Sequence, residues 1–244
     1  MANIQQPLPI QSVEKPILCS PFEEPARHWS YRGGVPEIVP YRRPASYWYK
    51  TEKIYTGQID MFGEEQREDL PLINALREDV KRWRDSGYEG ATEITKELLR
   101  YWQRPDRERR LFFCQVEAAE TAIYLTEIRL AGKYTRFKSA IKDDDLKKVL
   151  DQPADTGLAP LIRLGLKMAT GSGKTVVMSM LVAWTFCNRG RTPSDERFPQ
   201  AVLAVCPNLT IKERLQVLRP EDKDNYYAAF DLVPTRLREL LNKG

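Results

Sequence analysis

The residues best suited to chemistry lie together in the stretch MATGSGKT, residues 168–175. Gly171 and Gly173 give the backbone the conformational freedom to turn its amide groups toward a single anion. The ammonium group of Lys174 can reach the β- and γ-phosphates of a nucleotide, and the hydroxyl of Thr175 can ligate Mg²⁺. We predict a binding loop for ATP and Mg²⁺ in which Lys174 is the catalytic residue. Its nucleotide-binding residues are Thr170, Gly171, Ser172, Gly173, Lys174 and Thr175.

The loop matches the pattern G-x-x-x-x-G-K-[ST] except at its first position, where Met168 replaces glycine. The shorter pattern G-x-G-K-[ST] arises by composition on the order of once in a hundred chains of this length. Here it lies between a predicted strand, LIRLGLKMA, and a predicted helix, KTVVMSMLVAWTFCN, which is the context that a phosphate-binding loop requires. The alternative, a glycine-rich turn whose lysine has no role, is therefore disfavoured.

The elements around the loop predict an α/β fold. The apolar run AVLAVCP, residues 201–207, has the composition of a buried strand that ends at Pro207, and NLTIKERLQVL then predicts a helix. The order strand, loop, helix, strand, helix indicates a parallel sheet with helices on its faces.

The part of the chain before the loop divides into two predicted regions. Residues 1–68 form a proline-rich arm in which long helices are excluded, and residues 69–108 form a helical hairpin. The hairpin rests on apolar faces at Leu72, Ile73, Leu76, Val80 and Trp83, and at Ile94, Leu98, Leu99 and Trp102. A third helix begins near Leu111.

The arm carries arginines and aromatic residues that have two interpretations. In the first, they bind nucleic acid: Arg27, Arg32, Arg42 and Arg43 contact phosphates, and Trp29, Tyr41 or Trp48 stacks on bases. In the second, the arm is extended and packs its rings on the body of the protein, which we favour because rings need a core for burial.

Composition excludes several other function classes. The 244 residues carry a formal net charge of only +4, four cysteines without a C-x-x-C pair and a single histidine, His28. A zinc site is disfavoured, and Ser-His-Asp or Cys-His catalysis would depend on that one imidazole. The start lacks a secretion signal and no apolar stretch is long enough for a membrane span. We expect a cytoplasmic protein with free thiols and no membrane partner.

At this point the sequence resembles a known family. MATGSGKT is similar to motif I of superfamily 2 helicases, which often lack the first glycine. LFFCQVEAAETAIYLTEI before it and AVLAVCPNLTIKERL after it resemble the start of the helicase domain in Res subunits of type III restriction enzymes and related DEAD/DEAH-box proteins. The resemblance extends from about Tyr41 to the end of the chain. It implies the first part of a RecA-like domain over residues 109–244, with a parallel sheet flanked by helices.

The resemblance also implies roles for residues outside the loop. Gln115 matches the glutamine that reads the adenine edge, although an ordinary glutamine at a helix start is an equally good interpretation. Pro207, Asn208 and Thr210 match motif Ia, which contacts DNA phosphates, and Thr210 could equally be a helix cap. The implied partners are double-stranded DNA and a methyltransferase subunit.

Hydrolysis in this family needs an acidic pair, D-E-x-H, at the end of a buried strand. Two acids are candidates for this motif and neither fits it. Asp195 follows a polar loop instead of a buried strand, and Asp231 lacks a neighbouring second acid and a preceding β-branched run. We therefore expect an N-terminal part of an ATP-dependent helicase or translocase, ending before that motif and inactive by itself. The alternatives are another phosphate-loop enzyme such as a small-molecule kinase, and a truncated non-catalytic fragment that binds nucleotide or a partner protein.

Overall fold

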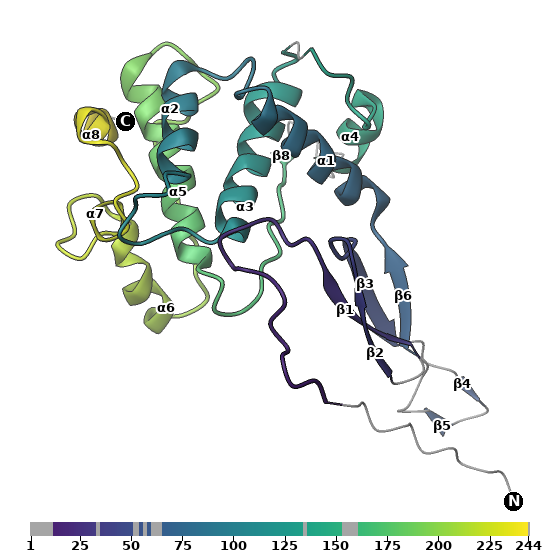
Figure 1. Cartoon of the computed structure of the whole chain (residues 1–244). Helices are drawn as coiled ribbons and strands as arrows, with labels where there is room; N and C mark the ends of the chain where they lie inside the picture. Colours follow the sequence, from purple (N-terminus) through teal and green to yellow (C-terminus); the bar gives the residue numbers. More distant parts are fainter. Residues whose placement is uncertain are drawn as a thin grey trace, which may run out of the picture. The chain divides into compact units, whose positions relative to one another are not determined.

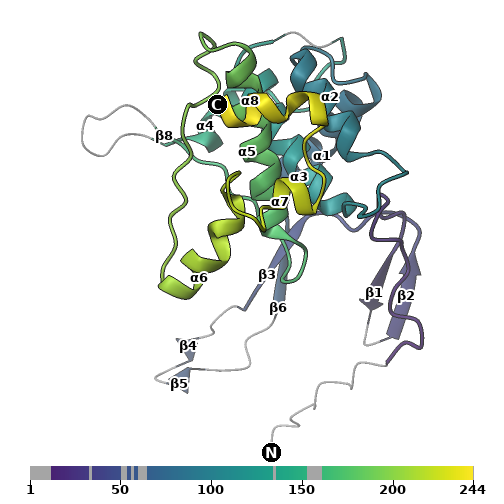
Figure 2. The same ribbon diagram turned by 90° about the vertical axis from the view of Figure 1, so that its left-hand side faces the viewer.

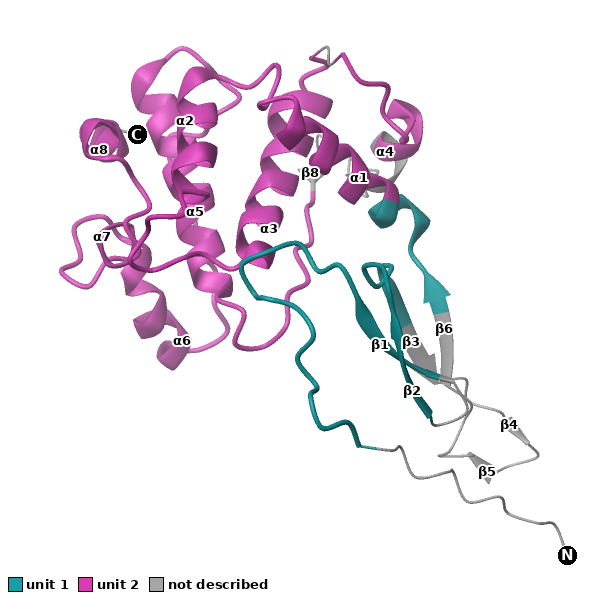
Figure 3. Cartoon of the chain, viewed as in Figure 1, with its two compact units in different colours: residues 1–74 teal, residues 75–244 magenta. Residues whose placement is uncertain are grey.

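The chain forms two compact units, residues 1–74 and residues 75–244 (Figure 3). The structure is a computed structural model, and it describes residues 12–32, 35–50, 54–55, 58–59, 65–133, 136–152 and 161–243.

Unit 1 is built from antiparallel strand pairs. β1 (His28–Arg32) and β2 (Val35–Val39) form a hairpin in which His28 lies opposite Val39. β3 (Ser46–Lys50) pairs with β6 (Glu65–Asp69), and β4 (Ile54–Tyr55) pairs with β5 (Gln58–Ile59). The described residues between 12 and 69 contain strands and no helix. Prolines permit strands here, because each pair has two open edges on which a missing N–H group costs no ladder bond.

The arginines of the arm bond within unit 1. Arg27 donates to the carbonyl of Leu18, Arg42 pairs with Glu24 at 3.5 Å, and Arg43 donates to the carbonyl of Trp29. These contacts hold the three arginines within unit 1 and do not test whether the rings pack on the body of the protein. Tyr41, one of those rings, is 57% exposed. The side chains of Arg32 and Trp48, which were also predicted to contact nucleic acid, lie outside the described residues.

Unit 2 is helical, and its longest described helix is α5 (Lys174–Arg191). Helices α2, α3 and α8 pack against α5, as the two views in Figures 1 and 2 show. The helices that precede α5 are α1 (Pro71–Asp85), α2 (Glu93–Trp102), α3 (Phe113–Ile123), the π-helix η1 (Tyr124–Arg129) and α4 (Asp143–Leu150). Those that follow it are α6 (Leu209–Arg214), η2 (Leu215–Leu218), α7 (Tyr226–Ala229), η3 (Thr235–Leu237) and α8 (Arg238–Lys243).

Burial confirms most of the apolar periodicity of the first two helices, but Ile73 is 40% exposed, and Leu72 and Ile94 are only half-buried. The buried positions repeat every three or four residues, which places them on one face of each helix. They are Leu76, Val80 and Trp83 in α1, and Leu98, Leu99 and Trp102 in α2. Thr92 caps α2 by accepting a hydrogen bond from the amide of Thr95, and Gly87 follows α1 with a φ of 73°.

A buried carboxylate fixes α2 against α5. Glu127 of η1 is 1% exposed and accepts hydrogen bonds from the Thr92 amide at 2.6 Å, the Thr95 hydroxyl at 2.7 Å and the Trp184 indole at 3.0 Å. A buried charge is costly unless it is fully hydrogen-bonded. Because its donors come from α2 and α5, satisfying Glu127 requires both helices to be in place.

The predicted parallel sheet, and with it the RecA-like domain over residues 109–244, is wrong. Every strand pair in the described part of the chain is antiparallel, including β7 (Asp151–Gln152) with β8 (Leu161–Ile162). Of the predicted strand LIRLGLKMA only Leu161 and Ile162 are in a strand, and residues 201–207 contain none. Leu203 and Val205 are 86% and 84% exposed. An apolar run becomes a buried strand only when neighbouring strands and helices cover it, and the described elements leave Leu203 and Val205 uncovered.

Gly190 allows α8 to lie close to α5. A Cβ atom at this position would meet the carbonyl oxygen of Leu240 at 2.5 Å and its Cα atom at 3.1 Å. Glycine is therefore required for this helix contact, although it weakens the last turn of α5.

We predict that Gly190→Ala destabilises the chain. The clash should cost about 1–3 kcal/mol, which exceeds the roughly 1 kcal/mol that alanine gains over glycine in a helix. Urea unfolding should show a lower midpoint for this variant. Gly165→Ala is the matched control, because a Cβ atom there would meet nothing within 4 Å. Equal midpoints for the two variants would contradict the close contact.

Candidate phosphate-binding site

The loop between Ala169 and Lys174 depends on two glycines in the left-handed conformation. Gly171 has a φ of 80° and Gly173 a φ of 78°, values that other residues rarely adopt. Gly173 is the N-cap of α5, so the loop leads directly into the helix. The helix predicted after the loop is present as α5, whereas the strand predicted before the loop is absent beyond Ile162.

Two side chains of the loop bond to one carbonyl group. The oxygen of Ala169 accepts hydrogen bonds from the Lys174 ammonium at 2.9 Å and from the Ser172 hydroxyl at 2.7 Å. Lys174 is exposed, as is Gly171. The ammonium group is thus accessible to solvent at the start of the helix. The sequence does not predict that Ala169 accepts these bonds, because they are made to its backbone carbonyl and any residue type could supply that group.

The start of α5 presents backbone donors. Within the described residues, the amides of Gly173, Lys174 and Thr175 donate no hydrogen bond, as expected for the first turn of a helix. The first backbone bonds of α5 run from Val176 and Val177 to the carbonyl of Gly173. Unpaired amides at the positive end of the helix dipole favour an anion.

Gln115 contacts this loop from another helix. Its side-chain Nε2 donates to the carbonyl of Ser172 at 3.1 Å, 57 residues further along the chain. Its Oε1 accepts a hydrogen bond from the amide of Phe112 at 2.8 Å, which caps the start of α3. Gln115 is 5% exposed. The structure therefore brings together two segments that the sequence analysis singled out separately.

Thr175 is the one predicted ligand for Mg²⁺. In the described part of the chain its hydroxyl makes no hydrogen bond, and no group of three or more His, Cys, Asp or Glu residues could hold a metal ion. A hydroxyl group beside a phosphate tail fits Mg²⁺, which commonly takes its remaining ligands from phosphate oxygens and water. The residues present are compatible with Mg²⁺ bound together with a nucleotide.

The two acids weighed in the sequence analysis are engaged elsewhere. Asp195 pairs with Arg197 at 2.6 Å, and the hydrogen bonds from Arg197 hold the pKa of the Asp195 carboxyl below its usual value. Asp231 accepts from the Tyr101 hydroxyl at 2.7 Å and pairs with Arg104 at 3.0 Å. Both carboxylates thus have structural partners.

The segment that resembles motif Ia lies on the surface. Pro207, Asn208 and Thr210 are all exposed, as is every residue of α6. The Asn208 side chain accepts a hydrogen bond from the amide of Ile211 at 3.0 Å, so that the cap of this helix is Asn208 and not Thr210. Thr210 remains accessible for other contacts.

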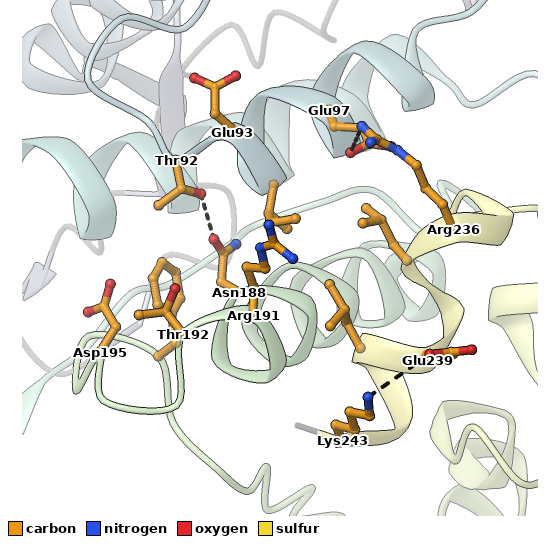
Figure 4. Close-up of a pocket in the computed structure, with 14 residues that line it drawn as sticks. Thr92, Glu93, Glu97, Asn188, Arg191, Thr192, Asp195, Arg236, Glu239 and Lys243 are labelled. Atoms are coloured by element: carbon orange, nitrogen blue, oxygen red, sulfur yellow. Dashed lines mark hydrogen bonds and ion pairs between the residues drawn. The ribbon is translucent and has the colours of Figure 1, made fainter.

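A hollow lies away from the loop. It has a volume of about 580 Å³ and is lined by the start of α2, the end of α5 and α8 (Figure 4). One ion pair at its wall joins Arg236 to Glu97 of α2, and another joins Lys243 to Glu239 within α8. None of the loop residues lines it. The sequence carries no signal for this cavity, because its walls come from segments far apart in the chain.

Comparisons with protein-family models, with curated proteins and with solved structures find no match for this chain. Among the described residues, none of the helices has the length and apolar character needed to cross a membrane.

We predict that Gly173→Ala disrupts the loop more than Gly171→Ala does. Both substitutions strain a positive φ, at a cost of about 1–2 kcal/mol, but only at position 173 would the Cβ atom clash, 2.1 Å from Nε2 of Gln115. At position 171 it would meet nothing within 4 Å. Thermal unfolding should therefore rank the stability of wild type above Gly171→Ala and Gly171→Ala above Gly173→Ala. A reversed order would refute the contact with Gln115.

Proposed function

We propose that the loop at residues 169–175 binds the phosphate tail of ATP together with Mg²⁺. The observation that carries this proposal is the combination of a solvent-accessible left-handed turn, three unpaired amides and the Lys174 ammonium at the start of one helix. These groups are the usual recognition elements for a polyphosphate. The proposal is independent of the predicted parallel sheet, because each group belongs to the loop or to α5.

We further propose that the chain is the N-terminal part of an ATP-dependent DNA helicase or translocase. This step rests on the resemblance to type III restriction Res subunits, and the contact between Gln115 and Ser172 supports it, because the two matching segments adjoin in space. The exposed residues Pro207, Asn208 and Thr210 would contact the DNA backbone. A cytoplasmic location and a methyltransferase partner belong to the same proposal.

In this proposal the residues have distinct roles. The amides of residues 173–175 hold phosphate oxygens, Lys174 neutralises their charge, and Thr175 ligates Mg²⁺, which polarises the phosphate when bound. Asp195 and Asp231, the two acids considered as bases for activating a water molecule, are each engaged by an arginine. We therefore expect nucleotide binding without appreciable hydrolysis by these 244 residues.

We predict that Lys174→Ala weakens binding of ATP-Mg²⁺ to the chain at least about tenfold, since a charge-assisted hydrogen bond is worth roughly 1.5–3 kcal/mol. Isothermal titration calorimetry would measure the dissociation constant. Lys167→Ala is the control, because Lys167 is an exposed lysine just before the loop, and its affinity should equal that of wild type. Unchanged binding by Lys174→Ala would refute the site.

We predict that replacing both Lys212 and Arg214 by alanine weakens binding of duplex DNA. Both residues are exposed on α6 beside the proposed contacts. If each neutralises one phosphate, the slope of log K against log salt concentration should fall by about 2. Fluorescence anisotropy across a salt series would measure the slope. The double variant of Arg219 and Lys223, which are also exposed, is the control, and an equal loss in both would indicate only general charge attraction.

A further inference from the structure

The contacts of Gln115 determine whether the candidate site can distinguish one nucleotide base from another. We infer that Gln115 positions the loop and does not read the base, so that the site accepts the polyphosphate tail of purine nucleoside triphosphates with little preference between adenine and guanine. This inference rests on the proposed function, in that it concerns the ligand of the same loop. It departs from the role that the family resemblance implies for this residue.

The polar atoms of Gln115 are engaged by the protein. To read adenine, a glutamine must offer its carbonyl oxygen as acceptor and its amino group as donor at the same edge. Here Oε1 accepts from the amide of Phe112 at 2.8 Å, and Nε2 donates to the carbonyl of Ser172 at 3.1 Å. Each atom keeps one further hydrogen or lone pair, so the side chain could pair with a base only if that remaining edge faced the ligand.

The location of the side chain points the same way. Gln115 is 5% exposed, and its amino group lies so close to Gly173 that a Cβ atom there would be 2.1 Å away. The amide group is therefore packed against the loop and covered by it. An edge that reads a base must face the ligand, and a covered amide has too little free surface to do so.

The remaining groups of the site suit phosphate and do not distinguish bases. They are the amides of Gly173, Lys174 and Thr175, the Lys174 ammonium and the Thr175 hydroxyl. Strong discrimination between polar ligands arises when buried donors and acceptors are left unpaired by the wrong ligand. The loop contains no such donor and acceptor pair for a purine edge, so that ATP and GTP should bind alike.

Removal of the Gln115 side chain should then weaken the binding of phosphate. Without its side chain the carbonyl of Ser172 and the amide of Phe112 each lose a partner, and the loop loses its link to α3. A more mobile loop loses more conformational entropy when it binds phosphate, which lowers the affinity. Affinity should therefore fall by the same factor for every ligand that carries a triphosphate, whatever its base.

The experiment measures binding of ATP, GTP and inorganic tripolyphosphate, each with Mg²⁺, to the 244-residue chain by calorimetry. For wild type we expect dissociation constants for ATP and GTP within about threefold of each other, the discrimination that contacts lacking specific hydrogen bonds give. Gln115→Ala should weaken all three ligands by a common factor of roughly two to ten, the range expected for one hydrogen bond. Thr121→Ala, which removes a hydrogen bond elsewhere on α3, should leave the three affinities unchanged.

Two outcomes would overturn the inference, and they are distinguishable. If wild type prefers ATP over GTP by more than about tenfold and Gln115→Ala removes that preference while tripolyphosphate still binds, Gln115 reads the base and the proposed function stands. If wild type binds none of the three ligands, the proposed function and the inference fail together. The comparison of ligands on wild type decides the question even if Gln115→Ala does not fold. Gln115→Glu, which keeps an acceptor for Phe112, is a second variant.

Discussion

The hydrogen bond from Gln115 to the carbonyl of Ser172 is the interaction on which the candidate site depends. Gly171 and Gly173 permit the left-handed turn but do not enforce it, because glycine pays the largest conformational entropy on ordering. A contact from a separate, buried side chain fixes the turn relative to α3. The same glutamine also caps α3 through Phe112, so the start of that helix and the shape of the loop are coupled. A loop that is fixed before its ligand arrives pays less to bind it.

Helix α5 connects the loop to the core of unit 2. It begins at the loop, places Trp184 against the buried Glu127 and ends where Gly190 meets Leu240 of α8. Glu127 is satisfied by donors on α2 and α5 rather than by a cation. Such an arrangement tolerates few alternatives, since removing one donor leaves a buried charge with an unpaired lone pair. The packing that supports the site thus relies on polar contacts as well as on apolar burial.

The sequence predicts the helices of unit 2 far better than its strands. Positions such as Val80, Trp83, Leu98 and Trp102 repeat at the helical period, and that period reports directly on which face is buried. The runs LIRLGLKMA and AVLAVCP have no such internal check, because an apolar run becomes a strand only through partners elsewhere in the chain. The loop was predictable from its glycines, whereas its contact with Gln115 through a backbone carbonyl left no mark on the residue types. The antiparallel pairs of unit 1 were missed because prolines exclude helices without excluding edge strands.

The absence of a parallel sheet from the described residues removes one argument for a motor. The strand predicted before the loop is also absent beyond Ile162, so the argument for phosphate binding now rests on the donors of the loop itself. A fold by itself does not define a function, and a function must be argued from the chemistry of its site. The donors that would hold a phosphate here, namely three amides, an ammonium and a hydroxyl, all lie within residues 173–175. Their arrangement needs a left-handed turn followed by a helix, and α3 and α5 supply the support for both. A sheet would matter for a carboxylate that activates water, which is the part of the chemistry that Asp195 and Asp231, each engaged by an arginine, do not offer. Phosphate binding therefore needs only contacts within the loop and the start of α5. Hydrolysis would also need a carboxylate positioned by elements far away in the chain.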